Sequence, residues 1–434
     1  MHSSFDLQRR RLIMATGASL LPTALSACGN AVAATATDGY RTVKDMHGRT
    51  VKVPRSVKRL VCTGSGALRV ASYLGALDLL VGIESSDLRY KNDPKRDYAF
   101  ANHNRFKSLP VIGKGGGTGY TANPEAILAV EPDVILTGYA PEAAEQLARE
   151  TGIPVVSVYY LSLGLVNDSF LKAIDLAGRI LGCEARAKSI VKFIENVQAD
   201  LQKRVHSRGQ EVGSSVYPGA VTFSGAHGFA GTYSRFGPLA AVGARSISDR
   251  QDREGFYETD LEFVLQQDPD LIFLDPGNLS IVAEEAKNKR DYFVSLKAVK
   301  TGNVYAMPSY NQYSTNIAYS LANAYYAGTV LFPEAFADVN FAAKFDESVS
   351  FFNGRGWYEH MAAIRPHRFS GDLDAKDRGT FGGSRTQGPF IRIGLFCCTS
   401  QGALLRRAPA AASFCCGVCL RLLSCFGRKP QGLR

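Results

Sequence analysis

Two glutamates, Glu125 and Glu262, occupy the same place in two similar stretches of this sequence. The first stretch is NPEAILAVEPDVIL, residues 123–136, and the second, which begins 137 residues later, is DLEFVLQQDPDLIF, residues 260–273. In each stretch the glutamate stands seven residues before a Pro-Asp pair, with apolar residues between them and a β-rich run afterwards. Carboxylates at equivalent positions can form two charge-assisted pairs with a symmetric partner.

A local role for these two glutamates is also open. A glutamate in the first turn of a helix complements the helix dipole. Thr259 and Glu262, moreover, have the spacing of a capping box. Pairing with a partner and a local role in the helix do not exclude each other.

A second set of residues follows the predicted strands. In open parallel sheets ligands bind at the carboxyl ends of the strands, where glycine-rich loops and helix N-termini present backbone N–H groups. The candidate ligand contacts are Thr63, Ser65, Gly117, Tyr120, Tyr139 and Tyr160 in the first half of the chain, and Ser224, His227, Arg235, Tyr310 and Tyr313 in the second. Aromatic and amide groups without dense acid suit a bulky chelate or an oxyanion better than a bare cation. Each tyrosine alone is better explained as a packed residue of its lobe than as a ligand contact.

The sequence offers little for a bare metal ion or for catalysis. Its seven histidines include no pair spaced three or four residues apart, whereas a zinc or manganese site needs several histidines together with carboxylates. Ser224 and His227 could belong to the active site of a hydrolase. TFSGAHG, however, is not the G-x-S-x-G motif of a nucleophile elbow, and that motif occurs nowhere else in the sequence. We therefore predict no catalytic residues, no protein-held metal and no cofactor.

Alternating strands and helices must position these residues. From residue 40 the sequence predicts a strand at 59–63, a helix at 67–74 and a short strand at 79–83. The first copy of the repeat, a helix followed by DVILTGY, comes next. Short apolar runs between helices indicate parallel strands that are buried on both faces. The pattern resumes at AVTFSGAHGF, residues 220–229, and continues through the second repeat to a closing helix, IAYSLANAYYAGTVLF.

Between these two regions lies a helical segment, residues 167–206, which Gly182 is expected to divide in two. The second helix, of about 22 residues, would span roughly 33 Å. The predicted fold is therefore α/β, with two doubly wound lobes (40–166 and 207–360) joined by a long rigid bridging helix. The ligand cleft is expected between the lobes.

The formal net charge of +10 does not indicate a nucleic-acid binder. Residues 1–28 carry +2 and residues 361–434 carry +9, which leaves −1 on residues 29–360. The folded part is therefore about neutral and offers no basic face to nucleic acid.

The two ends of the chain differ from the rest. Arg9, Arg10 and Arg11 precede an apolar run to Ala27, which is shorter than a spanning helix and is typical of an export signal. The run resembles a twin-arginine signal, with a Sec signal as the alternative, and LSAC resembles a lipobox with Cys28 as the lipidated residue. The tail, residues 361–434, holds six of the nine cysteines and is predicted to be disordered or a non-native extension, although Cys416 and Cys419 have metal-type spacing.

This layout resembles the helix-bridged substrate-binding proteins of bacterial ABC importers, which handle iron–siderophore complexes, haem and vitamin B12. The resemblance covers about residues 40–345. It rests on VKRLVCTGSGALRVASYLGALDLLVGIE, both copies of the repeat, LKAVKTGNVYAMPS and LFPEAFAD, in this order after the lipobox.

The resemblance implies a function and a set of partners. In this family a glutamate of each lobe docks onto arginines of the two permease subunits, and the matching positions are Glu125 and Glu262. The chain is then expected to be a monomeric lipoprotein of the periplasm or cell surface. It would capture an iron(III)–siderophore-type complex and deliver it to a permease dimer with its ATPase. A corrinoid, haem, molybdate or tungstate as ligand, or a sensing module without transport, are the alternatives.

Overall fold

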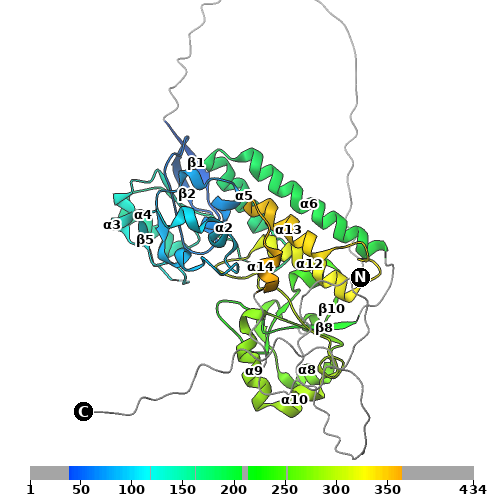
Figure 1. Ribbon diagram of the computed structural model, residues 1–434. Helices are drawn as coiled ribbons and strands as arrows, with labels where there is room; N and C mark the ends of the chain where they lie inside the picture. The colour runs from blue at the N-terminus through cyan, green and yellow to red at the C-terminus, as the bar shows by residue number, and fades with distance from the viewer. Residues whose placement is uncertain (1–38, 118, 162, 208–213, 251–252, 364–434) are drawn as a thin grey trace, which may run out of the picture.

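The computed structural model describes residues 39–117, 119–161, 163–207, 214–250 and 253–363 (Figure 1). The predictions for the export signal, Cys28 and the cysteine-rich tail lie outside these ranges. The described chain forms two α/β lobes, so the predicted fold class is confirmed. None of the helices in these ranges combines the length and the apolar character that crossing a membrane requires.

The first lobe is built on a parallel sheet. Its central strands are β3 (Leu60–Thr63), β6 (Val134–Thr137) and β7 (Val155–Ser157), in that order, and every residue in them is buried. A second parallel pair, β4 (Ile83–Glu84) and β5 (Val111–Gly113), joins this sheet through an isolated bridge between Leu60 and Leu80. The helices are α1 (Ala67–Tyr73), α2 (Asp97–Phe106), α3 (Pro124–Ala129) and α4 (Pro141–Thr151), and an antiparallel hairpin, β1 (Tyr40–Lys44) with β2 (Thr50–Pro54), precedes them.

The second lobe repeats the plan. Its four-stranded parallel sheet has the order β10 (Arg245–Ser246), β8 (Ser215–Gly219), β12 (Leu271–Leu274) and β13 (Val304–Ala306). A separate antiparallel pair consists of β9 (Gly231–Ser234) and β11 (Gly255–Glu258). The helices are α7 (Gly237–Ala241), α8 (Leu261–Gln267), α9 (Leu279–Asn288), α10 (Arg290–Ser295) and α11 (Lys297–Lys300).

Two helices follow the first lobe. The helix α5 (Asp168–Leu181) ends at Gly182, whose φ of 70° gives the left-handed turn that glycine favours, and α6 (Glu184–Ser207) begins directly afterwards. The 24 residues of α6 correspond to about 36 Å of helix. One neighbour of α6 is α5 (Figure 1), and α7 of the second lobe is another.

The last helices pack back across the molecule. The helix α12 (Ile317–Leu331) packs on α7, and α13 (Phe341–Asn353) packs on α12 and on α1 and α2 of the first lobe. A short helix, α14 (Tyr358–Ala363), completes the described chain. The C-terminal helices therefore connect the hydrophobic cores of both lobes.

The sequence repeat is also a structural repeat. Glu131 and Asp268, 137 residues apart, both have a positive φ, of 39° and 38°, before the proline that ends each turn. The aspartate of each Pro-Asp pair then accepts hydrogen bonds at the start of the neighbouring strand. Asp133 accepts from the backbone N–H of Arg59 at 2.9 Å, and Asp270 accepts from that of Ser215 at 2.8 Å. The repeated unit is thus a helix, a strained turn and a buried strand that is tied to its neighbour.

Three local expectations were wrong. The short strand expected at 79–83 begins only at Ile83, as β4, because a 3₁₀ turn occupies Leu77–Leu79. The second lobe restarts earlier than predicted, at β8, so residues 220–229 form a loop. The N-cap of α8 is Asp260, whose side chain accepts from the N–H of Glu262 at 2.9 Å, and not Thr259.

Candidate functional site

A cavity of about 560 Å³ lies between the lobes. The first lobe contributes Ser65, Lys95, Gly116, Gly117 and Leu161 to its wall. The second lobe contributes Thr222, Ser224, Gly225, Ala226, Gly277 and Asn278. The remaining lining residues, Ser309, Asn311, Gln312, Tyr313 and Ser314, belong to the segment 309–316 that leads from β13 to α12.

Most of the lining residues stand just beyond the carboxyl ends of parallel strands. Ser65 follows β3, Gly116 follows β5, and Gly277 follows β12. Strands of a parallel sheet end at the same edge, so the two sheets bring hydroxyl groups and backbone amides together in one cleft. Such a surface binds polar or anionic groups through hydrogen bonds.

Lys95 gives the cleft a positive charge. Among the described residues Lys95 has no carboxylate within ion-pair distance. A Cβ placed on Gly277 would lie 3.9 Å from the Lys95 Nζ, so this side chain of the first lobe reaches the opposite wall. An unpaired ammonium group in a polar cleft favours a ligand that carries negative charge.

Asp275, which lies beside Gly277, does not neutralise that charge directly. Its carboxylate accepts hydrogen bonds from the Ser309 hydroxyl, from the Gly277 N–H at 2.8 Å and from the Thr222 N–H at 3.4 Å. Burial nevertheless raises the pKa of Asp275 above its ordinary value. The carboxylate therefore holds the second-lobe loops in place.

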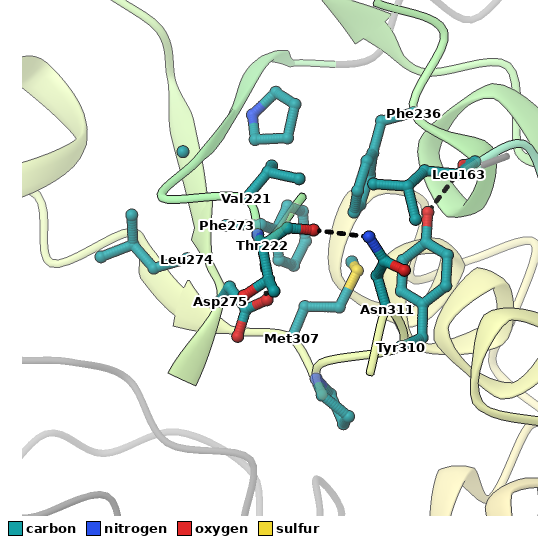
Figure 2. A pocket seen from close by; sticks show the side chains of 13 residues that line it. Leu163, Val221, Thr222, Phe236, Phe273, Leu274, Asp275, Met307, Tyr310 and Asn311 are labelled. Carbon is teal, nitrogen blue, oxygen red and sulfur yellow. Dashed lines mark hydrogen bonds between the residues drawn. The ribbon is translucent and has the colours of Figure 1, made fainter. Parts of the chain in front are cut away.

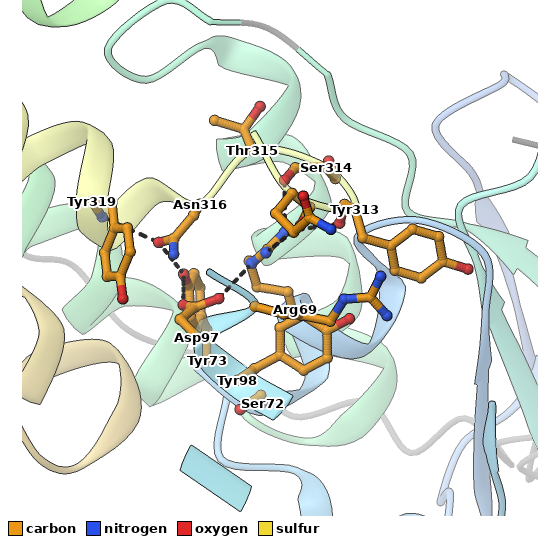
Figure 3. A network of polar contacts seen from close by, with 12 residues as sticks. Arg69, Ser72, Tyr73, Asp97, Tyr98, Tyr313, Ser314, Thr315, Asn316 and Tyr319 are labelled. Carbon is orange, nitrogen blue, oxygen red and sulfur yellow. Dashed lines mark hydrogen bonds and ion pairs between the residues drawn. The ribbon is translucent and has the colours of Figure 1, made fainter. Parts of the chain in front are cut away.

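The segment 309–316 is fixed to the first lobe by a buried arginine. Arg69 of α1 donates hydrogen bonds to the backbone oxygens of Gln312 at 2.8 Å, Tyr313 at 2.9 Å and Ser314 at 2.9 Å (Figure 3). Tyr313 and Ser314 have positive φ angles of 54° and 75°, which cost free energy for residues other than glycine. The guanidinium group thus stabilises a strained segment whose side chains line the cleft.

The side chain of Tyr313 is held by a second buried acid, Glu84. The Tyr313 hydroxyl donates to Glu84 Oε2 at 2.7 Å, and the Gly64 N–H donates to Oε1 at 3.0 Å. Burial, followed by the nearby charge of Asp87, raises the pKa of Glu84 to about 7. The Arg96 guanidinium lies over the Tyr313 ring, 4.2 Å from its centroid. Glu84 and Arg96 of the first lobe therefore both hold the Tyr313 side chain in place.

Four of the predicted ligand contacts line the cleft: Ser65, Gly117, Ser224 and Tyr313. Thr63, Tyr139, Tyr160 and Tyr310 are instead buried behind its walls, each at most 3 % exposed. Their hydroxyl groups are used internally. Tyr160 donates to the Thr315 oxygen at 3.1 Å, and Tyr310 donates to the Leu163 oxygen at 2.7 Å.

The other three predicted contacts do not line the cleft. Tyr120 donates a hydrogen bond to Glu150. The two ring nitrogens of His227 lie 3.2 Å from Glu258 Oε1 and 2.8 Å from the Phe223 oxygen. Arg235 is an exposed residue with a φ of 55°. Its backbone N–H donates to Asp249.

Sequence reasoning did not name Lys95, Thr222 or Gly277 individually. Gly277 was discoverable, because it follows β12, a strand that the sequence predicts, by three residues, whereas Thr222 follows β8, which the sequence did not predict. Lys95 was not discoverable, because it lies in a loop before α2 and no strand end precedes it.

A much smaller cavity, of about 20 Å³, lies behind the cleft wall (Figure 2). Thr222 and Asn311 border both cavities, and the Asn311 amide donates to the Thr222 oxygen at 3.0 Å. The rest of its lining is mainly apolar, with Phe236, Met307 and the backbone near Asp275. Its volume suits one water molecule, so it is a packing defect of the wall and not a ligand site.

Glu125 and Glu262 are both exposed and lie away from the cleft. Each is the second residue of its helix, α3 or α8. Within the described ranges neither forms an ion pair. Nor do three or more histidine, cysteine, aspartate or glutamate side chains gather there in a way that could hold a metal ion.

Comparisons with known proteins identify relatives of this architecture. A family model described as "Periplasmic binding protein" matches residues 60–311. An uncharacterized ABC transporter substrate-binding lipoprotein of Bacillus subtilis (strain 168), YvrC, is 23% identical over 280 residues, which cover 61% of this chain and 77% of that protein.

Solved structures share the fold at low sequence identity. A periplasmic solute binding protein from Veillonella parvula DSM 2008 gives a TM-score of 0.57 at 18% identity, over 75% of this chain and 96% of that one. The Haemophilus influenzae protein MolA, solved with molybdate, gives a TM-score of 0.56 at 20% identity, over 73% of this chain and 99% of that one. At this level of identity the likeness establishes the fold alone.

Proposed function

Because the chain belongs to the periplasmic binding protein family, we propose that it captures an anionic iron(III)–siderophore-type complex and delivers it to an ABC importer. The family and the lipoprotein relative are sufficient to establish the general function. The chain is an extracytoplasmic substrate-binding protein of an ABC transporter, it is not an enzyme, and such proteins work with permease and ATPase components. The identity of the ligand is the part that we propose.

The unpaired charge of Lys95 is the observation that carries this proposal. The cleft has room for a small chelate, since ligand sites commonly measure about 300–1,000 Å³. Its walls present hydroxyl groups, amides and glycine backbone, and among the lining residues that the structure describes Tyr313 is the one with an aromatic side chain. Haem or a corrinoid would need a broader apolar wall, and the buried positions of Tyr139, Tyr160 and Tyr310 do not provide one.

The test is calorimetric titration of the purified protein with ferric complexes of hydroxamate, catecholate and carboxylate siderophores, with haem, and with a corrinoid. We expect submicromolar one-to-one binding of a negatively charged ferric complex. Lys95→Gln should weaken that binding at least tenfold, while Lys91→Gln, at an exposed position four residues earlier, should not. Tight binding that is unchanged in Lys95→Gln, or preferred binding of haem, would contradict the proposal.

An oxyanion such as molybdate or tungstate is the second candidate. The observation that favours it is the density of hydroxyl groups and glycine amides around Lys95, which are typical ligands of oxyanions. An oxyanion is much smaller than the 560 Å³ cleft, so binding it would require the lobes to approach each other. Submicromolar binding of molybdate, together with no detectable binding of any ferric complex, would favour this candidate.

The proposal includes how the protein reaches its transporter. A diacyl group on Cys28, after export by a twin-arginine or Sec signal, would hold a monomer near the permease. Glu125 and Glu262 would dock onto basic residues of the two permease subunits. Charge reversal at both glutamates should abolish uptake and leave ligand affinity intact. Uptake that survives would show that the two glutamates are not the docking contacts.

A further inference from the structure

Each lobe exposes a leucine one helical turn after its glutamate. Five large apolar side chains are exposed in the part of the chain that the structure describes, and two of them are Leu128, 45% exposed, and Leu265, 37% exposed. These leucines are 137 residues apart, the same offset that relates Glu125 to Glu262. The exposed leucine is therefore part of the repeat, as the glutamate is.

The helix geometry places each leucine beside its glutamate. Residues three apart in a helix are neighbours on its surface, so Leu128 lies next to Glu125 on α3, and Leu265 lies next to Glu262 on α8. The residue just before each leucine, Ile127 or Val264, is fully buried and supplies the contact of the helix with its lobe.

The folds of the lobes do not account for these leucines. More than a third of the surface of each leucine remains in water, so packing within its own lobe leaves a large part of its apolar surface unburied. Single exposed apolar residues are common on protein surfaces. The same residue type at the same step after the same acid, in two copies that differ at nine of their fourteen positions, indicates a shared partner.

We propose that each docking point has two parts, a carboxylate (Glu125 or Glu262) and an exposed leucine (Leu128 or Leu265) that acts as an apolar knob. Its partner would offer a basic residue beside an apolar socket. The proposal rests on the importer function inferred above and names its partner surface. Two equivalent knobs on two lobes fit a partner with two equivalent sockets, which a dimer of permease subunits provides. The carboxylates supply steering and orientation, and the leucines supply affinity that salt does not screen.

The first experiment identifies the partner in intact cells. A photoreactive benzoylphenylalanine replaces Leu128 or Leu265 in the full chain in its source bacterium, and crosslinked products are identified by mass spectrometry. Both positions should crosslink to the permease, each to one subunit of the dimer. Tyr40, 45% exposed but outside the repeat, is the matched control position and should not. Crosslinks from positions 128 and 265 to unrelated proteins, or to none, would overturn the inference.

The second experiment separates the two parts of the docking point. The affinity of the full chain for that permease–ATPase complex in nanodiscs is measured at several salt concentrations. Leu128→Ser and Leu265→Ser should each weaken binding about fivefold, and together about 25-fold, with an unchanged salt dependence. Glu125→Gln and Glu262→Gln should reduce the salt dependence instead.

Ligand titration and thermal melting of every variant serve as controls. If the leucine variants bind the complex within twofold of the unmodified chain while the glutamate variants lose binding, the inference is wrong and the proposed docking stands. If neither set changes binding, the docking site lies elsewhere and both are wrong. Failure of the unmodified chain to bind any ligand of the panel would count against the proposed ligand class alone.

Discussion

The Nε of Arg69 lies 2.9 Å from Oδ1 of Asp97, and neither side chain is accessible to solvent. Asp97 also accepts a hydrogen bond from the Tyr73 hydroxyl at 2.6 Å. The remaining guanidinium donors of Arg69 bind the carbonyls of the 309–316 segment (Figure 3). One buried ion pair therefore ties α1 and α2 of the first lobe to the segment that lines the cleft.

Removing this arginine should destabilise the protein strongly. Arg69→Met leaves the Asp97 carboxylate buried and unpaired, so we expect the free energy of unfolding to fall by about 3–5 kcal/mol in urea titrations. Arg105→Met is the matched control, because its pair with Asp78 is 44% and 84% exposed and should contribute at most about 1 kcal/mol. Equal losses in the two variants would contradict the role assigned to Arg69.

Glu84 should make stability depend on pH. Its folded-state pKa of about 7 exceeds the ordinary value of 4.5, so the folded state binds the proton more tightly than the unfolded state. The stability that protonation contributes is complete below pH 4.5 and is lost as the pH rises through about 7. Relative to Glu84→Gln, the unmodified chain should lose about 3 kcal/mol across this window.

The measurement is the free energy of unfolding of both proteins at a series of pH values from 4 to 8. Because histidines titrate in the same range, the difference between the two proteins is the quantity to compare. A difference that does not change with pH would mean that Glu84 titrates normally.

Replacing Gly138 should destabilise the protein, because the surrounding atoms leave no room for a side chain. A Cβ at this position would lie 1.8 Å from the backbone oxygen of Ser65, a cleft residue. Gly138→Ala must displace the 64–66 loop, so we expect a stability loss of about 1–3 kcal/mol together with weaker ligand binding. Gly119→Ala, where a Cβ meets no atom within 4 Å, is the control and should change neither quantity measurably.

The two aspartates of the repeat should contribute similarly to the free energy of unfolding. Asp133 and Asp270 each accept the N–H of a residue at or just before the first strand of its sheet. Replacing either with alanine leaves that N–H without its charged acceptor, and we expect losses of about 1.5–3 kcal/mol in each case. Urea unfolding of Asp133→Ala and Asp270→Ala measures both. If one loss of unfolding free energy were tenfold the other, the two copies of the repeat would not be equivalent.

The elements that the sequence predicted well are those specified by local patterns. The strands β6 and β12, the helix break at Gly182 and the repeat itself each depend on a few adjacent residues. The strand β8 was missed because its sequence, SVYPG, contains proline and glycine, which are uncommon in central strands.

The site was predicted only in part, because side-chain direction depends on contacts distant in sequence. Side chains in the loops that follow the strands have no regular period, so the sequence does not fix which of them point into the cleft. Tyr160 and Tyr310 point inward because backbone oxygens of Thr315 and Leu163 accept their hydroxyl groups, 155 and 147 residues away. Arg69 looked like an ordinary helix residue for the same reason.

The carbonyls that Arg69 binds lie 243, 244 and 245 residues further along the chain. Contacts of such separation form slowly, because the loop-closure entropy is lost before the contact is gained. On the ribosome, the first lobe is synthesised long before the segment that completes the cleft. The nascent chain therefore has no complete cleft until residue 316 has emerged.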